Sequence, residues 1–591
     1  MASNGRKLQA LAILAGFCLW LGVAGPARAQ QASDERRCTG EIKASADEQI
    51  AACTALLDSG RYSTANLAII HSNRGIAHRR EGEIDQAIAD FDAAIKLNPK
   101  HVRAYINRGN AYYAKGAFKR AIADFNEAIR LDPKNPSSYM SRGNAFDDHG
   151  DGDRAIVDYD QAIRLNPNYA PAYFNRGLAH RRRGEFDKAI ADYDQAIKLD
   201  PQYASAYNNR GNAWRGKGEF DRAIADFGQA IKLDANFTLA FVNRGLAWYD
   251  KKNYDRAIAD FDAAIKLAPD NARAFLNRGN AYDDKGEHEK ALADYDQAIK
   301  LDPNYEDAYY NRGIALRRKG EFDRAIADYS RAIRLGQNNA KAYNERGLAW
   351  YDKHEFDRAI ADFTQAIKLD PKFAIAHNNR GNAYDEKGDR QRAIADYDEA
   401  ILVDPSYAAA YYNRGLAWRR QGNLDRAIAD YDKAIKLNPG RAAAYNNRGT
   451  AWDAKGDYDR AIADFNEAIK LDPKAAHLYN NRGNAWRNKG NFERASADYD
   501  KSIALNPTYA RAFYNRAWVH YLAGRYQPAI ADVDKALTLQ ARSATALSLR
   551  GLIHEKLGER DQAIADFKQA LAVDPNFAQP KEALKRLGAA E

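Results

Sequence analysis

The chain has 591 residues, of which 45% are hydrophobic and 29% are charged, and its net charge is +9. This apolar content argues against a disordered chain, and Gly and Pro recur in phase instead of scattering. The net charge is mild for this length and does not indicate a nucleic-acid-binding protein. The composition therefore predicts a folded, internally periodic protein whose partner is not a nucleic acid.

Residues 1–29 differ from the rest of the chain. A positively charged start and an apolar run at residues 8–23 are followed by small residues at Ala27 and Ala29, the two positions that a signal peptidase reads. The apolar run is short for a membrane span. We expect a signal peptide cleaved after Ala29 and a periplasmic or secreted protein without stable membrane insertion. The alternative is an uncleaved N-terminal anchor.

Two cysteines remain after this cleavage, Cys38 and Cys53, and both fall in a segment at residues 30–68 that precedes the repeats. Export to an oxidising compartment makes a disulfide between them plausible, and it would staple the N-terminal end. The alternative is a pair of unlinked thiols. Within this segment, residues 47–58 are typical of a helix that caps the start of an array.

Residues 69–577 repeat every 34 positions, fifteen times, without an insertion. We number each unit from an anchor residue, which is glycine except at Ala517, and we write offsets from it as positions. The anchors are Gly75, Gly109, Gly143, Gly177, Gly211, Gly245, Gly279, Gly313, Gly347, Gly381, Gly415, Gly449, Gly483, Ala517 and Gly551. Such a strict period is typical of a solenoid of short helical units.

Each unit is predicted to hold two helices. The first helix contains the anchor, and the second carries Ala at position +12, Phe or Tyr at +16 and Ala at +19 with few exceptions, which are steps along one helical face. Glycine at +7 ends the first helix in most units, and proline usually follows the second. Lys252 and His354 replace that glycine, so their turns should be strained. Ala235, Gln337 and Ala541 replace the proline, so their joints should be looser.

This pattern resembles the tetratricopeptide repeat (TPR), through its aromatic–Gly–aromatic first helix, its Ala–Phe/Tyr–Ala second helix and its closing proline. The resemblance implies an all-α, right-handed superhelical solenoid whose first helices line a concave groove that binds protein or peptide. We expect residues 578–591 to form a C-terminal capping helix. The chain departs from the family at position −1, where arginine stands in every unit in place of a large apolar residue.

Aspartate stands at position +15 in every unit, from Asp90 to Asp566, and matches the arginine at −1, from Arg74 to Arg550. The two positions each lie eight residues from the turn, so antiparallel helices place them at equal height. We predict a ladder of charge-assisted Arg–Asp bonds, within units or between neighbours, that serves as structural glue.

Asparagine occupies position −2 in most units, and its amide could pair with a peptide backbone whatever the ligand's side chains. The alternative is that these amides bond within the repeat. The candidate peptide-binding asparagines are Asn73, Asn107, Asn175, Asn209, Asn243, Asn277, Asn311, Asn379, Asn413, Asn447, Asn481 and Asn515.

Charged pairs alternate at positions +4 and +5, where acidic pairs such as Asp147 and Asp148 precede basic pairs one unit later. They are either stations that read charged ligand side chains or partners of one another. The candidate basic residues are Arg181, Arg182, Arg317, Arg318, Arg419 and Arg420.

The sequence contains no phosphate-binding loop, no zinc-type histidine spacing and no nucleophile elbow. We therefore expect no catalytic residues, no metal and no cofactor, and the oligomeric state stays open. The favoured function is a non-catalytic scaffold outside the cytoplasm that binds an extended protein segment in its groove. The alternative is a structural part of a secretion or polysaccharide-export apparatus, where tyrosines such as Tyr113 could stack on sugars. An enzyme is disfavoured because the repeats leave no room for a catalytic domain.

Overall fold

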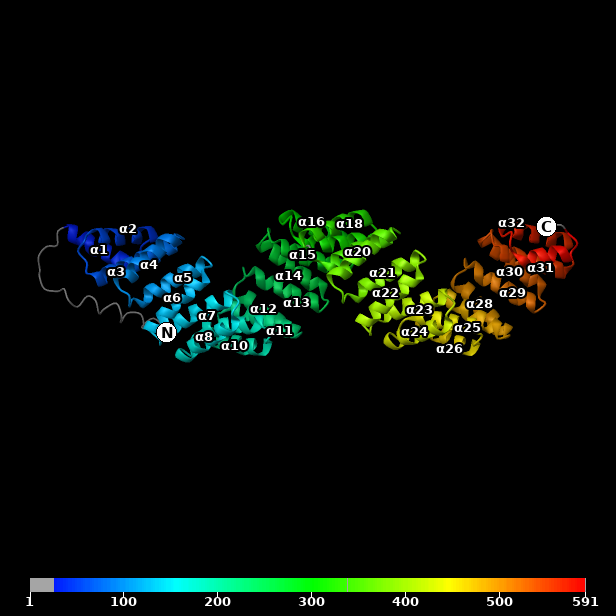
Figure 1. Cartoon of the computed structure of the whole chain (residues 1–591), viewed down its shortest axis with the longest axis horizontal. Coiled ribbons are helices and arrows are strands. Elements are labelled where there is room, and N and C mark those ends of the chain that lie inside the picture. The colour runs from blue at the N-terminus through cyan, green and yellow to red at the C-terminus, as the bar shows by residue number, and fades with distance from the viewer. Residues whose placement is uncertain (1–25, 337, 590–591) are drawn as a thin grey trace. The chain divides into compact units, whose positions relative to one another are not determined.

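The computed structural model describes residues 26–336 and 338–589, and this part of the chain is helical with no strand (Figure 1). The helices are α1 (Pro26–Thr39), α2 (Ala46–Asp58), α3 (Thr64–Arg80), α4 (Ile84–Leu97), α5 (Val102–Ala114), α6 (Phe118–Leu131), α7 (Pro136–Asp148), α8 (Gly152–Leu165), α9 (Ala170–Arg182), α10 (Phe186–Leu199), α11 (Ala204–Gly216), α12 (Phe220–Leu233), α13 (Thr238–Asp250), α14 (Tyr254–Leu267), α15 (Ala272–Lys285), α16 (His288–Leu301), α17 (Glu306–Arg318), α18 (Phe322–Leu335), α19 (Ala340–Asp352), α20 (Phe356–Leu369), α21 (Ala374–Glu386), α22 (Arg390–Val403), α23 (Ala408–Arg420), α24 (Leu424–Leu437), α25 (Ala442–Ala454), α26 (Tyr458–Leu471), α27 (Ala476–Asn488), α28 (Phe492–Leu505), α29 (Ala510–Leu522), α30 (Tyr526–Leu539), α31 (Ala544–Leu557), α32 (Arg560–Val573) and α33 (Ala578–Arg586). The predicted all-α solenoid of helix-turn-helix units is confirmed.

Residues 1–25 lie outside the described residues, and with them most of the predicted signal peptide. The predicted cleavage point after Ala29 falls inside α1. None of the described helices is long and apolar enough to cross a lipid bilayer.

The chain divides into two compact bodies, residues 1–287 and 288–591. Within each body, every helix packs on its neighbours in chain order (Figure 1). The first helices of successive units also contact one another, as α3 does with α5 and α19 with α21. In the described part of the chain, successive second helices have no comparable contact, because each packs on the first helices on either side of it. The first helices are therefore more closely spaced, and we call the side that they line the inner face.

The anchor glycine is required by the aromatic ring of the second helix. A Cβ atom on Gly245 would lie 2.6 Å from the ring of Phe261, which is completely buried. At the one anchor that is not glycine, Ala517, the second helix carries the smaller Val533 in place of the ring. Ala517 is consistent with this steric requirement, because its methyl group lies against Val533, which is smaller than an aromatic ring.

The turns between the two helices use left-handed backbone. Gly82, for example, has a φ of 82°. Lys252 and His354 occupy the same place with a φ of 60° each, a conformation that side chains with a Cβ disfavour. The left-handed backbone from which the strain was predicted is therefore present at both turns, and the strain itself stays a prediction.

The joints between units respond unequally to the loss of proline. At Ala235 the chain keeps the usual turn, in which the amide of Phe237 donates to the carbonyl of Asp234. At Ala541 the chain bends without that turn, and the side chain of Ser543 caps α31. Gln337 lies outside the described residues, and the looser packing expected at these joints stays a prediction.

Both ends of the array carry extra helices. The helix expected at residues 47–58 is α2, and it pairs with α1, a helix that was not predicted from the sequence. The structure joins the two helices by a disulfide between Cys38 and Cys53, whose Cα atoms are 4.9 Å apart. At the other end, α33 buries Leu584 against α32.

Candidate functional site

The seam between the two helices of a unit is held by a forked ion pair. Arg244 donates from Nε and Nη2 to the two oxygens of Asp260, over 2.8 Å and 2.6 Å, and Asp260 is buried. The same fork, to the aspartate sixteen residues later, is formed by Arg74, Arg108, Arg142, Arg176, Arg210, Arg312, Arg346, Arg380, Arg414, Arg448, Arg482, Arg516 and Arg550. The predicted Arg–Asp ladder is confirmed.

In most units the third arginine nitrogen ties the unit to the one before it. Nη1 of Arg210 donates to Asp194, at position +17 of the preceding unit, over 2.5 Å. Burial raises the pKa of Asp226, the forked partner of Arg210, and the guanidinium opposes that shift. The prediction left open whether the Arg–Asp bonds form within units or between adjacent units, and the structure contains both kinds.

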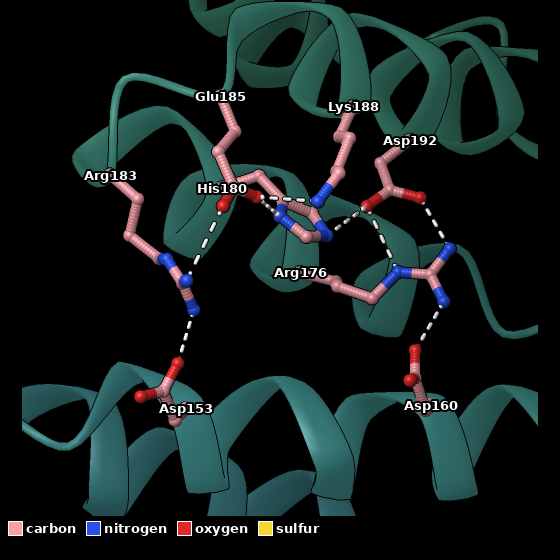
Figure 2. A network of polar contacts seen from close by, with 8 residues as sticks. All are labelled: Asp153, Asp160, Arg176, His180, Arg183, Glu185, Lys188 and Asp192. Atoms are coloured by element: carbon pink, nitrogen blue, oxygen red, sulfur yellow. Dashed lines mark hydrogen bonds and ion pairs between the residues drawn. The ribbon is translucent and has the colours of Figure 1, made fainter.

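Figure 2 shows this network around Arg176, which lies between Asp192 of its own unit and Asp160 of the preceding one. Beside it, Nδ1 of His180 lies 2.7 Å from the carboxylate of Glu185. On the turn side, Arg183 pairs with Asp153 of the preceding unit.

The pair on the turn side recurs along the chain. The cation at position +6 reaches an acidic residue thirty positions earlier, as Lys217 does with Asp187 over 2.5 Å. Most of the repeated charges are thus used to hold the array together.

Most asparagines at position −2 donate to a polar side chain on the first helix of the preceding unit, along the inner face. The Nδ2 of Asn243 donates to Asn208, at position −3 of the preceding unit, over 2.9 Å. Equivalent bonds to the preceding first helix are made by Asn175, Asn379, Asn413, Asn447, Asn481 and Asn515. These contacts favour the alternative in which the amides bond within the array.

Three further members of the series differ from this pattern. Asn209 donates to the carbonyl of Ser205 in its own helix. Asn107 and Asn277 have buried Nδ2 atoms without a hydrogen-bond partner. Asn73 and Asn311 stand at the same position of α3 and α17. Ligand contact by the series therefore stays a prediction, and it is best supported where the amide is unpartnered.

The charged pairs at +4 and +5 are partly neutralised along the inner face. Arg182 pairs with Asp147 of the preceding unit, and Arg420 pairs with Asp385 in the same way. Arg317 instead reaches forward to Asp352, over 2.8 Å.

The other three candidate arginines take different places in this pattern. Arg181 and Arg419 stand beside the paired Arg182 and Arg420, and each has a buried Nε without a hydrogen-bond partner. Arg318 follows Arg317 at the exposed end of α17. The basic stations are therefore not equivalent.

Sequence reasoning missed the polar residues that support this face from positions −3 and +1. Asn144, at +1, accepts both from Asn175 of the next unit and from the hydroxyl of Tyr159, at +16 of its own unit, over 2.8 Å and 2.9 Å. The signal was present, because the asparagines at −3 and +1 also keep the 34-residue phase. Their pairing needs the contact between units, which a single unit does not contain.

Within residues 26–336 and 338–589, no group of three or more His, Cys, Asp and Glu side chains is arranged to hold a metal ion. Within each compact body the arrangement can instead present a row of side chains of varied charge on one face. This is the class of protein that fold and face define: a helical repeat scaffold.

Comparison with protein families identifies the repeat. Models described as "Tetratricopeptide repeat" and "TPR repeat" match most of the chain, so the chain belongs to the tetratricopeptide repeat family. The first description matches residues 73–136, 208–272, 310–374, 344–400, 378–442, 419–476, 476–509 and 544–577, and the second matches residues 143–182, 177–215 and 279–320. Proteins of this family are generally non-catalytic scaffolds suited to protein–protein interaction.

No curated protein matches the chain. Among solved structures, the chain is similar to the APC/C hetero-tetramer Cut9–Hcn1, with 16% identity over 82% of this chain and 96% of that one and a TM-score of 0.44. It is also similar to a tetratricopeptide repeat protein from Parabacteroides merdae, with 23% identity over 43% and 100% of the two chains and a TM-score of 0.37. A third similar structure is pilF from Pseudomonas aeruginosa, with 22% identity over 36% and 97% and a TM-score of 0.33.

Proposed function

We propose that this protein is a non-catalytic scaffold outside the cytoplasm that binds an extended protein segment along its inner face. The observation that carries the proposal is the contrast between the seam and the inner face. The seam repeats one ion pair, whereas position +4 of the first helices is occupied in turn by Arg, Tyr, Asp and Glu. Variation on one face of an otherwise uniform frame is what reading a non-uniform ligand requires.

Two features support a location outside the cytoplasm. The N-terminal 29 residues have the pattern of a signal peptide. The buried disulfide between Cys38 and Cys53 is of a kind that persists in oxidising compartments. Mass spectrometry of the exported protein is expected to find Gln30 at the N-terminus, and retention of residues 1–29 on the protein isolated from the cytoplasm would contradict the proposal.

Ligand binding is tested by photo-crosslinking in cells. A benzoylphenylalanine replaces Tyr249 in the first compact body or Tyr351 in the second, both at position +4 of a first helix. Matched controls carry it at Val157 and Leu402, which lie on second helices and are 61% and 73% exposed. Crosslinks to a protein from the inner positions and none from the controls are expected.

The outcomes separate the candidate functions. Equal crosslinking at inner and control positions would refute an inner binding face. Adducts that contain carbohydrate and no protein would favour the alternative role in polysaccharide export. Turnover of a substrate by the purified chain would refute the non-catalytic assignment.

A further inference from the structure

The same two polar atoms lack a partner in three separate units. The hydroxyl of the tyrosine at +16 and the Nε of the arginine at +4 are both buried without a hydrogen bond. The pairs are Arg181 with Tyr193, Arg317 with Tyr329, and Arg419 with Tyr431. All three tyrosines are completely buried. Because a buried unpartnered polar group costs free energy, its recurrence at fixed positions calls for an explanation.

The residue at +1 separates these tyrosines from others at the same position. Where +1 is asparagine, the hydroxyl donates to it, as Tyr397 does to Asn382 and Tyr499 to Asn484, over 2.9 Å and 2.8 Å. In the three exceptional units +1 is Leu178, Ile314 or Leu416. These units therefore keep the hydroxyl but have replaced its acceptor with a hydrocarbon side chain.

The position of the hydroxyl follows from the same comparison. The asparagine at +1 also accepts from the first helix of the next unit, as Asn382 does from Asn413 over 3.0 Å. The tyrosine hydroxyl thus reaches between the first helices toward the inner face. In the exceptional units Arg181 lowers the pKa of Tyr193, and Arg419 lowers that of Tyr431, against the rise that burial causes. Each arginine acts through its charge and through a contact with the hydroxyl that is too poorly aligned for a regular hydrogen bond.

The charge of Arg181 and Arg419 is not neutralised by a neighbour. Neither forms an ion pair with an acidic side chain in the described part of the chain, whereas the adjacent Arg182 and Arg420 do. An aromatic ring at −3 closes one side, since Phe174 lies 5.9 Å from the ring of Tyr193 and Tyr412 lies 6.0 Å from that of Tyr431. Two donors, an unneutralised cation and an aromatic wall suit a small anion.

The unit that contains Arg317 indicates that this anion is a carboxylate. Arg317 has two carboxylates around it, Asp352 at 2.8 Å and Glu345 at 3.6 Å. Glu345 stands at −2 of the next unit, where most units have asparagine, and it is the largest charged influence raising the pKa of Tyr329. Here the chain provides from its own side chains the carboxylates that Arg181 and Arg419 lack.

We propose that Arg181 with Tyr193, and Arg419 with Tyr431, form two separate binding sites for glutamate or aspartate side chains of an extended protein ligand, and that the Arg317 site is filled by the chain's own carboxylates. This inference rests on the proposed function, in which the inner face binds protein. The guanidinium pairs with the ligand carboxylate, and the tyrosine hydroxyl donates to it. Burial raises the pKa of Tyr431 to about 12, so the hydroxyl carries its proton at neutral pH.

The test uses the purified full-length protein and a fluorescein-labelled peptide of eight glutamates flanked by glycines, with an eight-glutamine peptide as control. Fluorescence anisotropy at 150 mM salt measures the affinity. We expect the glutamate peptide to bind and the glutamine peptide not to bind. Arg181→Gln combined with Arg419→Gln should weaken binding at least tenfold, which corresponds to one lost charge-assisted hydrogen bond.

The chain provides matched controls. Arg317→Gln removes an arginine of the same position and should change the affinity less than twofold. Glu345→Gln removes one of the two carboxylates from Arg317 and should tighten binding. Tyr193→Phe combined with Tyr431→Phe keeps the buried rings and should weaken binding several-fold while the thermal unfolding midpoint stays within 2 °C of the parent or rises.

The inference is overturned if the double arginine variant binds the glutamate peptide as the parent does, or if Arg317→Gln weakens binding as much. It is also overturned if fluorescein-labelled alginate, an acidic polysaccharide, binds through these arginines while the glutamate peptide does not bind. Crosslinks from Tyr249 to a protein segment without acidic residues would leave the proposed function standing while removing this inference.

Discussion

The seam between paired helices and the inner face of the first helices share one 34-residue period, yet they tolerate change very differently. At the seam, arginine at −1 and aspartate at +15 recur in all fifteen units. On the inner face, the residue at +4 changes from unit to unit among cation, anion and phenol. The seam meets a requirement that is the same in every unit, namely the pairing of a buried aspartate with a half-buried arginine, whereas the inner face meets no such shared requirement. The difference assigns stability to the first surface and is the ground on which we propose recognition for the second.

The largest effect should come from breaking one seam pair. Asp260→Ala leaves the guanidinium of Arg244 without its forked partner, which costs about 3–5 kcal/mol for a buried pair. Because repeat arrays unfold by segments, the loss should appear as faster hydrogen exchange in α13 and α14. The control Asp255→Ala removes an exposed partner of Lys285 and should cost less than about 1 kcal/mol. Unchanged exchange in Asp260→Ala would contradict the structural role of the ladder.

The N-terminal hairpin should depend on its disulfide. Replacing Cys38 and Cys53 by serine opens a loop of about 15 residues, and the chain-entropy model gives a loss near 3 kcal/mol. Limited proteolysis should then cut within α1 and α2 first and leave α5 and later helices intact. Cleavage at the same rate as in the parent would show that packing alone holds the hairpin.

The anchor glycine can be tested through its aromatic neighbour. Gly245→Ala brings a methyl group against the ring of Phe261 and should cost about 1–3 kcal/mol, seen as a lower thermal unfolding midpoint. In the background of Phe261→Val, which copies the Ala517 and Val533 pair, the same substitution should cost little. Additive losses in the double variant would refute the steric explanation.

The smallest predicted effect concerns a strained turn. Lys252→Gly places glycine where φ is 60° and should stabilise the first compact body by about 1 kcal/mol. The neighbouring Lys251→Gly should destabilise it, because Lys251 has a φ of −77° and pairs with Asp221. Equal effects of the two substitutions would show that the turn carries no strain.

The sequence was sufficient to predict the features that are determined within a single repeat unit. The glycine at +7, the alanines at +12 and +19 and the charges at −1 and +15 predicted the helix pairs, their turns and the seam. It was insufficient for α1, because this helix is polar and buries Cys38 without an apolar stripe that periodicity could reveal. It was also insufficient for the inner face, where bonds such as Asn243 to Asn208 join residues 35 apart in neighbouring units. The unpartnered Tyr193 hydroxyl could be recognised only against Tyr159, whose acceptor is present.

The contrast between seam and inner face can be tested inside a single unit, the one anchored at Gly177. Asp192→Ala changes the seam and Arg181→Ala changes the inner face of the same helix pair, and the thermal unfolding midpoint of each variant is compared with the parent. We expect Asp192→Ala to lower the midpoint by several degrees, and Arg181→Ala to leave it within about 1 °C. If Arg181→Ala destabilises the array as much as Asp192→Ala does, the arginine belongs to the frame and the assignment of recognition to the inner face is contradicted.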